Sequence, residues 1–586
     1  MIRNIFLLFS VYCCCCITGS ANTYTLFNKG LTAYSIIISN ESSPSEKFAA
    51  YEMQKYLKEI GGVTLKIQSE KYGKRGKRIV IGYNRIAKLC DNDLQKPTET
   101  DQSYRYFNVG GDIIIVGGSN IGTLYGVYSF LENELGCRWL TSKVSFVPHK
   151  ESCFFSSFNV SSSPSFVYRY IYTKGAHDKL WSLRNTNNGI PDKYLSMYGD
   201  IQDCQYPYWS VHTFDRFVPP SLYFKSHPEY YSLIKGKREA KQLCLTNSKV
   251  IELCIKGLRE IIIANPNYKV YDLSQNDNIS SCHCYNCNII KSKYGSESGL
   301  IVWFVNSVAK ELKRDFPDKY IGTLAYQYSQ KPPKSIVPFS NVFVRLSLIN
   351  TCLIHNLENC PKNKSAGEDV KNWHRLTQNL FVWDYISTSR IYYAPIPNIE
   401  AIKSRLVFYK ENGVKGVFIE GNSGTAYGEF ADLRNYVISK LLWNPYLNLD
   451  NLVCDFINRY YGNVAAIIKE YYELTQERAK KTNIHLFFVM DHRNAVYSED
   501  YLESAYSILS QAEKKANSKE IMERVRNEKM SVAYMLCKVN PRKSIINGAL
   551  DFVRMWTNEN KIQKFAGYGE NVDKERFFEQ MKQFEN

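Results

Sequence analysis

The sequence lacks the motifs that mark several large enzyme classes. It has no G-x-S-x-G segment around a nucleophilic serine, no glycine-rich nucleotide loop and no histidine triad for a catalytic metal. It also has no internal repeat and no heptad run. These absences argue against a serine hydrolase of that type, a nucleotide-dependent enzyme and a metalloenzyme, so we expect no cofactor for catalysis.

Long hydrophobic runs are also missing after the N-terminus. The first residues combine Arg3, an apolar run from Ile5 to Thr18 and the small residues Gly19-Ser20-Ala21, the pattern of a signal peptide over residues 1–21. Cys13 to Cys16 have no Leu-small-small pattern before them, which argues against a lipid anchor. We expect an exported protein, periplasmic or at the cell surface, without a transmembrane segment.

The charge is strongly positive but dispersed. The net charge is +17, yet lysines and arginines alternate with acids along the chain. The densest basic run, Lys71 to Arg78, is typical of a turn between two strands, and no nucleic-acid recognition module accompanies it. We therefore expect a solvated basic surface and no nucleic-acid partner. The aromatic fraction of 14%, with 44 tyrosines, suits the stacking of sugar rings, but a generally tyrosine-rich composition explains it equally well.

Cysteines are numerous and unevenly spaced. Of 17 cysteines, four lie in the N-terminal segment, which leaves thirteen, an odd number that argues against a complete disulfide framework. Cys282, Cys284 and Cys287 form one tight cluster, typical of a structural zinc site or of a disulfide with a free thiol. Cys244 is the first choice for a fourth metal ligand, with Cys254, His283 and Cys352 as alternatives.

The pattern of strands and helices predicts an α/β protein of three units. Residues 22–160 form a small α/β domain, residues 161–440 a TIM-type (β/α)8 barrel and residues 441–586 a helical C-terminal region. Ser161 to Pro164 is interpreted as a linker, Gly110-Gly111 and Gly117-Gly118 as hairpin turns, and the tail from residue 540 as irregular. The eight barrel strands are expected at 166–172, at 201–205 or 208–212, and at 230–234, 270–274, 321–326, 342–347, 380–383 and 416–419.

The carboxyl ends of these strands carry aromatic, amide and acidic residues. Barrels of this type place their chemistry at that end. The residues expected to bind substrate there are Arg169, His212, Tyr326, Tyr328, Asn350, Trp383, Asp384, Tyr385 and Asn422. Stacking faces, hydroxyl-binding groups and acids together predict a carbohydrate site.

Three residues are the catalytic candidates. Asp277 is the candidate general acid, because glycosidic cleavage needs a proton on the leaving oxygen. Asn276 beside it would orient a 2-acetamido group acting as the internal nucleophile. Glu420 follows a buried strand and would be a base, a nucleophile or a hydroxyl clamp. The alternatives are a simple Asn-Asp-Asn turn for 276–278 and an arginine ion pair for Glu420.

Several motifs together resemble one protein family. They are GTLYGVYSFLENELGCRWL (122–140), SHPEYYSL (226–233), QLCLTN (242–247), SQNDN with CHCYNC (274–287), TLAYQYSQKPP (323–333), GVFIEGNSG (416–424), LLWNP (441–445) and YYG (460–462). The family is the domain of unknown function 4838, now glycoside hydrolase family 163, and the resemblance covers roughly residues 120–465.

The resemblance implies an endo-β-N-acetylglucosaminidase that cuts between the two core GlcNAc residues of complex N-glycans, in a gut or host-associated Bacteroidota context. It also implies a first domain similar to the one before the barrel in α-glucuronidases and β-hexosaminidases. Asp277 and Glu420 lie within matching motifs. Two alternatives stay open from the residues themselves: an exo-acting glycosidase for uronic acids or hexosamines, and a non-catalytic glycan-binding protein. The oligomeric state is not predicted.

Overall fold

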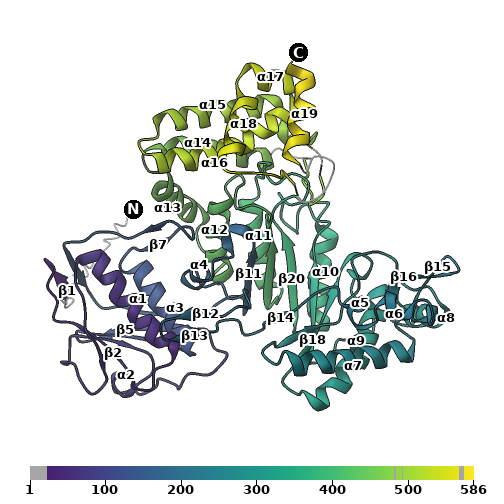
Figure 1. The fold of residues 1–586 in the computed structure, drawn as a ribbon. Coiled ribbons are helices and arrows are strands. Elements are labelled where there is room, and N and C mark those ends of the chain that lie inside the picture. The colour runs from purple at the N-terminus through teal and green to yellow at the C-terminus, as the bar shows by residue number, and fades with distance from the viewer. Residues whose placement is uncertain (1–22, 481–483, 491, 567–572, 586) are drawn as a thin grey trace, which may run out of the picture.

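The computed structural model describes residues 23–480, 484–490, 492–566 and 573–585. The expected signal peptide lies outside these residues. Figure 1 shows three lobes around a central sheet: the first unit in purple and blue, a teal lobe opposite it and the helical C-terminal region above both. No helix in the described part of the chain has the length and apolarity that a bilayer crossing needs.

The first unit is a mixed sheet covered by helices. Its strand order is β10-β5-β6-β4-β2-β3, and only the β10–β5 and β5–β6 pairs are antiparallel. The strands are β2 (Ser35–Ile38), β3 (Ile67–Ser69), β4 (Arg78–Ile81), β5 (Tyr104–Val109), β6 (Asp112–Gly117) and β10 (Asn159–Ser162). Two short pairs flank them: β1 (Tyr24–Asn28) with β9 (Ser152–Phe155), and β7 (Arg138–Trp139) with β8 (Ser145–Phe146).

Alternation along the strands divides the apolar side chains between two faces of this sheet. One face packs in the large core that includes α1 (Pro44–Gly61) and α3 (Asn120–Asn133), and the other packs with α2 (Arg85–Cys90).

Ser43 and Glu46 form a capping box at the start of α1. Ser119 caps α3, so Gly117-Gly118 leads into a helix and is not the predicted hairpin turn. Ser161 and Ser162 pair with β5, so they are not a linker.

The central unit is a seven-stranded parallel sheet that curls toward a barrel (Figure 1). Its order is β11-β21-β20-β19-β18-β17-β14. The strands are β11 (Tyr168–Tyr172), β14 (Tyr208–Trp209), β17 (Val270–Asp272), β18 (Tyr320–Ala325), β19 (Val342–Ser347), β20 (Leu380–Tyr385) and β21 (Gly416–Glu420). Because all pairs are parallel, the carboxyl ends meet at one end of the sheet. The predicted α/β fold with a TIM-type barrel is confirmed.

One predicted barrel strand lies elsewhere. Residues 231–234 form β15 (Tyr231–Ile234), which pairs antiparallel with β16 (Lys237–Leu243) in the teal lobe. The turn between them, Lys235-Gly236, has positive φ at both residues, as a tight two-residue hairpin needs. Within the described chain no ladder joins β11 to β14. Beside β11, the backbone N–H groups of Asn188 and Gly189 both donate to the Arg169 carbonyl instead.

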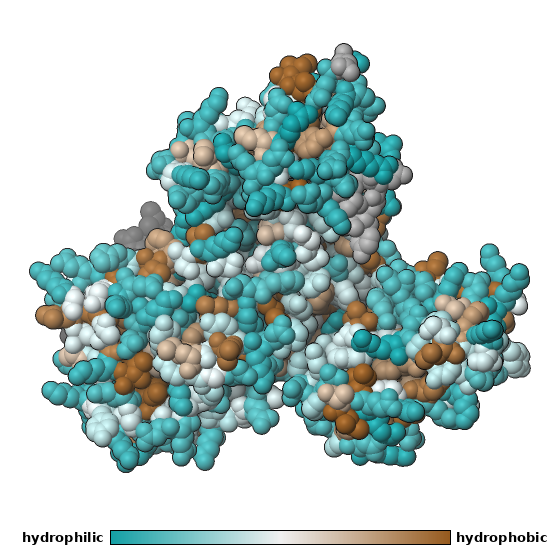
Figure 2. All heavy atoms as spheres, viewed as in Figure 1, coloured by the Kyte–Doolittle hydropathy of each residue, from teal (hydrophilic) through white to brown (hydrophobic). Residues whose placement is uncertain are grey.

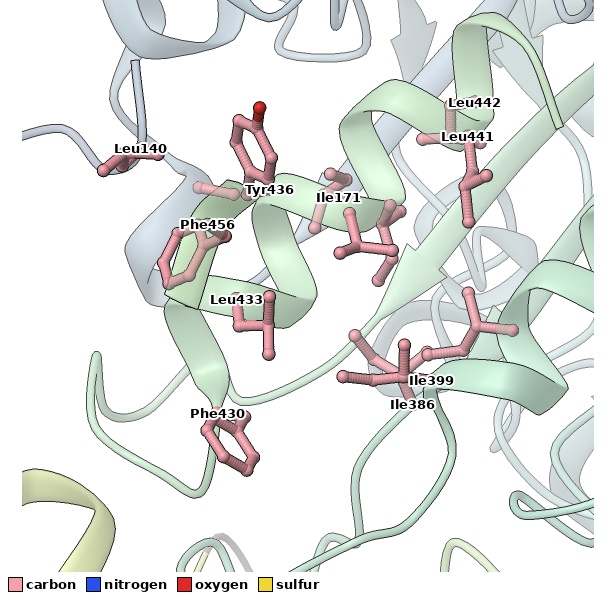
Figure 3. Close-up of a cluster of buried hydrophobic side chains, with 14 of the residues drawn as sticks. Leu140, Ile171, Ile386, Ile399, Phe430, Leu433, Tyr436, Leu441, Leu442 and Phe456 are labelled. Carbon is pink, nitrogen blue, oxygen red and sulfur yellow. The ribbon is translucent and has the colours of Figure 1, made fainter. Parts of the chain in front are cut away.

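Helices surround the central sheet and build the teal lobe at its side (Figure 1). They are α4 (Lys179–Arg184), α5 (Phe214–Phe217), α6 (Pro220–Tyr223), α7 (Ser248–Ala264), α8 (Tyr285–Tyr294), α9 (Glu297–Asp315), α10 (Lys364–Leu376), α11 (Ile399–Glu411) and α12 (Ala431–Trp443). A hairpin of β12 (Tyr194–Ser196) and β13 (Gly199–Ile201) packs against α1. Figure 3 shows α12 at the junction, where Leu433 and Tyr436 lie among Leu140 of the first unit and Phe456 of the third.

In the C-terminal region the named elements of the described residues are all helices. Its helices are α13 (Leu449–Tyr461), α14 (Ala465–Lys480), α15 (Glu499–Lys515), α16 (Lys519–Val539), α17 (Pro541–Ile546), α18 (Ala549–Glu559) and α19 (Lys574–Glu585). The prediction of an irregular tail from residue 540 is therefore wrong. Phe552, Val553 and Trp556 give α18 a buried face at helical spacing. On the face drawn in Figure 2, hydrophilic residues dominate all three lobes.

Candidate active site

A cavity of about 390 Å³ lies at the carboxyl ends of the central strands. Its lining combines two carboxylates, one histidine, four aromatic rings and one arginine. The lining residues are His212, Asp277, Leu324, Tyr326, Ser347, Ile349, Trp383, Tyr385, Ser389, Arg390, Glu420, Phe488 and Val489. Six of them, His212, Asp277, Tyr326, Trp383, Tyr385 and Glu420, are predicted site residues.

Glu420 ends β21 with its side chain directed into the sheet's concave side. Phe418, two residues earlier, faces the same interior, as strand alternation requires. The Trp383 indole Nε1 donates a 2.9 Å hydrogen bond to Glu420 Oε2. Burial raises the pKa of Glu420 to about 7; the hydrogen bond from Trp383 opposes that rise and the negative charge of Asp277 adds to it. A substantial share of Glu420 is therefore protonated at neutral pH.

Asp277 lies across the cavity, just beyond β17. Tyr326 Oη donates a 2.9 Å hydrogen bond to Asp277 Oδ1, and Gln327 Nε2 donates to Tyr326 Oη at 2.8 Å. Burial and the neighbouring Asp277 both raise the pKa of Tyr326, so its hydroxyl stays a donor. Gln275 donates to the Tyr326 carbonyl at 3.1 Å and fixes the backbone of this pair. The network therefore fixes the position of the Asp277 side chain, with Oδ1 as the acceptor.

His212 is held beside this pair by the backbone of the strand end. Its Nδ1 lies 2.7 Å from the Gln275 carbonyl oxygen, so Nδ1 donates and Nε2 is left for other contacts. The backbone has φ 54°, a left-handed conformation that is uncommon outside glycine. The ring centroid lies 5.7 Å from that of Tyr326. The histidine can therefore act as a hydrogen-bonding group toward a ligand in the cavity.

One wall of the cavity is aromatic and comes from two distant segments. Trp383 and Tyr385 stack with ring centroids 6.2 Å apart, and Tyr385 contacts Phe488 at 4.7 Å. Phe488 and Val489 belong to the C-terminal region, and the Phe488 carbonyl accepts the backbone N–H of Ser389 at 2.9 Å. The helical region thus completes a cavity whose acids belong to the barrel.

Asn276 does not line the cavity. Its side-chain amide donates to Asp215 Oδ1 and to the Lys241 carbonyl, both at 2.8 Å, and its Oδ1 accepts the backbone N–H of Asp215 at 3.2 Å. With these three bonds made, the side chain anchors the loop that presents Asp277. The acetamido-orienting role predicted for Asn276 is not supported by this placement.

Asp384 and Arg169 face the outside of the sheet. Asp384 is buried against Arg405, 2.6 Å away, and accepts a further 2.6 Å bond from Tyr409. The Arg169 guanidinium donates to the carbonyls of Phe166 and Thr186, each at 2.7 Å. Both residues alternate with aromatic residues that face the interior, so neither reaches a ligand there. The structure thus places both residues away from the cavity, in contacts that hold the fold together.

The remaining predicted ligands also lie apart from this cavity. Tyr328 lines a separate, small space between Phe214 and Cys282. Asn350 is exposed on a turn after β19. Asn422 donates to the Tyr392 carbonyl at 2.8 Å beside another small space.

Several lining residues were not predicted. Arg390 and Ser389 follow β20 in a loop, and Phe488 and Val489 are distant in sequence. Ser347 shares the inward parity of Phe343 and Arg345 on β19, so alternation could have identified it. Arg390 belongs to no recognisable sequence motif. Only the folded structure shows that it lines the same cavity as Asp277 and Glu420.

The predicted thiol cluster is brought together. Cys244, Cys282, Cys284 and Cys287 are all buried, with their sulfurs within 4.8 Å of one another. Cys244 Sγ lies 3.6 Å from Cys284 Sγ and 3.9 Å from Cys287 Sγ, close to the roughly 3.8 Å edge of a tetrahedral zinc thiolate site and far from a disulfide bond of about 2.05 Å. Leu233 N and Arg238 Nη1 donate to Cys282 Sγ. The donor set fits a closed structural metal site.

Solved structures with the same fold can be compared with this chain. A parallel barrel-type sheet has its site at the carboxyl ends of the strands, where this cavity lies. A solved family GH115 4-O-methyl-α-glucuronidase with specificity for decorated arabinogalactans matches with a TM-score of 0.53 at 12% identity, covering 92% of this chain and 78% of that one. A family 89 glycoside hydrolase from Clostridium perfringens, in complex with 2-acetamido-1,2-dideoxynojirimycin, matches with a TM-score of 0.50 at 10% identity, covering 93% and 65%. At these identities the likeness is one of fold.

The family is identified by sequence. The model of the family described as Domain of unknown function (DUF4838) matches residues 139–473, more than half of the chain. The protein belongs to the DUF4838 family, and that part of the predicted resemblance is confirmed. No curated protein matches the chain.

Proposed function

We propose that this protein is an exported glycoside hydrolase that cleaves the GlcNAc-β1,4-GlcNAc core of complex N-glycans, as an endo-β-N-acetylglucosaminidase of glycoside hydrolase family 163. The observation that carries the hydrolase proposal is the pairing of Glu420, whose pKa is raised to about 7, with Asp277 in one cavity. The resemblance of the sequence motifs to that family supports the linkage.

In the proposed mechanism Glu420 is the general acid. A proton donor must be protonated at the working pH, and burial gives Glu420 that property. Its proton passes to the glycosidic oxygen as the bond from that oxygen to C1 breaks. In the second step water attacks C1, the bond between C1 and the substrate's acetamido oxygen breaks, and the Glu420 carboxylate accepts the proton of that water. This exchanges the roles expected from sequence, where Asp277 is the acid.

Asp277 is the charge-stabilising partner. The carbonyl oxygen of the substrate's own 2-acetamido group forms the new bond to C1, and Asp277 accepts the N–H of that group as positive charge develops. Tyr326 keeps Asp277 in position through the 2.9 Å hydrogen bond. Since β18, β19 and β20 separate β17 from β21 in the sheet, the two acids approach from opposite sides of the mouth. Acid and internal nucleophile act on opposite faces of the sugar, as this reaction requires.

The test is incubation of the protein with a complex biantennary N-glycoprotein, followed by mass spectrometry of both products. We expect a released glycan one GlcNAc short, with that GlcNAc left on asparagine. Glu420→Gln and Asp277→Asn should each abolish release. Asn350→Ala, an exposed residue outside the cavity, is the matched control and should retain activity. Full turnover by Glu420→Gln would contradict the proposal.

Arg390 favours a second candidate, an exo-acting glycosidase for uronic acids. It is exposed at the rim of the cavity, where a guanidinium would pair with a sugar carboxylate. Aryl uronides and aryl hexosaminides, compared in parallel, separate the two: loss of a single terminal sugar supports exo action. Tight glycan binding without any product would instead support a binding protein.

We also propose that Cys244, Cys282, Cys284 and Cys287 hold a structural zinc ion that fixes the segment after Asp277. Zinc bound by these thiolates would connect the β15–β16 hairpin to the start of α8. Cys284→Ser should release one equivalent of metal and lower thermal stability.

Export is proposed from the N-terminal pattern of the sequence. Fractionation of expressing cells, with N-terminal sequencing, tests it. The expected mature protein begins after residue 21, in the periplasm or at the cell surface.

A further inference from the structure

A second cluster of metal-binding side chains lies at the junction of the barrel and the C-terminal region. Cys352, His355, Cys360 and His485 each offer one donor atom, and these four atoms all lie within 4.8 Å of one another. From this convergence we propose a second zinc-type metal site, a tetrahedral Cys2His2 centre that joins the loop after β19 to the segment before Phe488. It stands apart from the four-cysteine cluster and does not depend on the proposed enzymatic function.

Three of the six distances between donor atoms are close to those of tetrahedral zinc coordination, and all six are within 4.8 Å. His355 Nδ1 lies 3.3 Å from Cys352 Sγ and 3.8 Å from Cys360 Sγ, and His485 Nδ1 lies 3.7 Å from Cys360 Sγ. Zinc bonds of about 2.3 Å to sulfur and about 2.0 Å to nitrogen place such donors about 3.6 Å apart. A tetrahedral ion therefore fits among these donors with little movement.

The histidine tautomer is already set for metal binding. His355 Nε2 faces the Ala479 carbonyl at 3.1 Å, and a carbonyl can only accept. The proton therefore resides on Nε2, which leaves the lone pair of Nδ1 directed at the cysteines. Metal-bound histidines commonly have this outer hydrogen bond to a carbonyl.

Hydrogen bonds from Asn363 and Arg405 fix the backbone of the loop after β19. The buried Asn363 accepts the backbone N–H of Cys352 at 2.7 Å and donates to the carbonyls of Cys352, His355 and Asn356 at 3.0–3.1 Å. Arg405 donates to the carbonyls of Cys352 and His355. Asn363 and Arg405 therefore bond the backbone polar groups of the loop from its outer side. The thiol and imidazole side chains point to the inner side, where they converge.

Charge also favours this donor set for a divalent ion. Two thiolates and two neutral imidazoles around Zn²⁺ sum to zero charge. Cys352 and Cys360 are buried, and a neutral centre avoids the cost of an isolated buried thiolate. Among the described residues, none of these cysteines forms a disulfide.

The site would position a wall of the cavity. Leu353 N donates to the Leu486 carbonyl at 2.7 Å, and Asn494 donates to the His485 carbonyl at 2.8 Å. Phe488 and Val489 follow His485 within a few residues and line the cavity. Bound metal thus couples the C-terminal segment to the acids of the barrel.

Metal stoichiometry of the full-length protein tests the site without any activity assay. The reduced protein is stripped with a chelator and titrated with Co²⁺, whose visible bands report tetrahedral sites and whose ultraviolet bands report thiolate ligands. We expect the wild type to bind two equivalents of Co²⁺ and each of the variants Cys360→Ser, His485→Ala and Cys284→Ser to bind one. Cys254→Ser, a buried cysteine outside both clusters, should retain two.

Replacing one metal ligand by another controls for variants that lose metal only because they misfold. His485→Cys should keep two equivalents and increase the thiolate-to-cobalt absorption, because a third sulfur replaces a nitrogen. Two equivalents in His485→Ala, or one in the wild type that only Cys284→Ser removes, would overturn the proposal. A disulfide between Cys352 and Cys360 in the freshly purified protein, detected by mass spectrometry, would also overturn it.

Discussion

Trp383 on β20 donates its indole N–H to the Glu420 carboxylate on the neighbouring strand β21, at 2.9 Å. The bond favours the charged form of the acid, while burial favours the neutral one. The balance of these two effects leaves Glu420 titrating near neutrality. The first prediction alters one side of that balance.

Trp383→Phe removes the hydrogen bond and keeps an aromatic ring. Because the bond lowers the pKa of Glu420, its loss should raise that pKa and move the alkaline limb of the kcat/KM profile upward by about one pH unit. For the wild type we expect activity to fall as pH rises through about 7, where the acid loses its proton. A pH profile of both proteins on one substrate checks this. An unmoved limb would show that another group sets it.

Glu420→Gln should reveal what burial of the acid costs in stability. The folded pKa of about 7 lies above the 4.5 of an exposed glutamate, so the native state binds more protons between these values and stability falls as pH rises through that window. The variant lacks this loss. We expect it to unfold with the same free energy as the wild type near pH 4 and to exceed it at pH 8 by at most about 3 kcal/mol. Urea unfolding at both pH values measures the difference.

Asp384→Asn should destabilise the fold while leaving substrate affinity unchanged. The substitution leaves Arg405 buried without its negative partner, a change that costs about 3 kcal/mol. Asp315→Asn is the matched control, since its 2.7 Å pair with Arg259 is exposed and contributes less than about 1 kcal/mol. Unfolding midpoints and the KM of the folded fraction are the measurements. A raised KM with normal stability would restore a sugar-binding role for Asp384.

Phe488→Ala should weaken substrate binding through a residue outside the barrel. The ring contacts Tyr385 at 4.7 Å on the aromatic wall. Loss of one stacking ring costs about 1 kcal/mol, so KM should rise several-fold with little change in kcat. Phe487→Ala, at the adjacent position but outside the cavity lining, is the control. Equal effects of both substitutions would argue for a general loss of folding.

The sequence predicted much of the barrel because its strands carry strong local signals. Runs such as Val342–Ser347 and Gly416–Glu420 are rich in β-branched and aromatic residues and end in polar residues. The hairpin at Tyr231–Ile234 has the same local signal, and only pairing distinguishes it from a barrel strand. The local sequence pattern therefore identified which segments are strands, but it did not show which strands pair with each other.

The site was predicted in part for a related reason. Asp277, Glu420, Trp383 and Tyr385 were found by their place at strand ends. Asp384 and Arg169 were predicted to bind substrate but face outward, as their alternation with Tyr385 and Tyr170 indicates. Arg390 and Phe488 were missed because their position depends on tertiary contacts. The four-cysteine cluster was found because most of it is local, whereas the pairing of His355 with His485 is not.

The long separation between Cys360 and His485, 125 residues, has a consequence for how the protein matures. A growing chain that has emerged only as far as α13 already contains both acids but lacks the wall of their cavity. Catalytic competence would therefore arise late in synthesis, after the C-terminal segment has returned to the barrel.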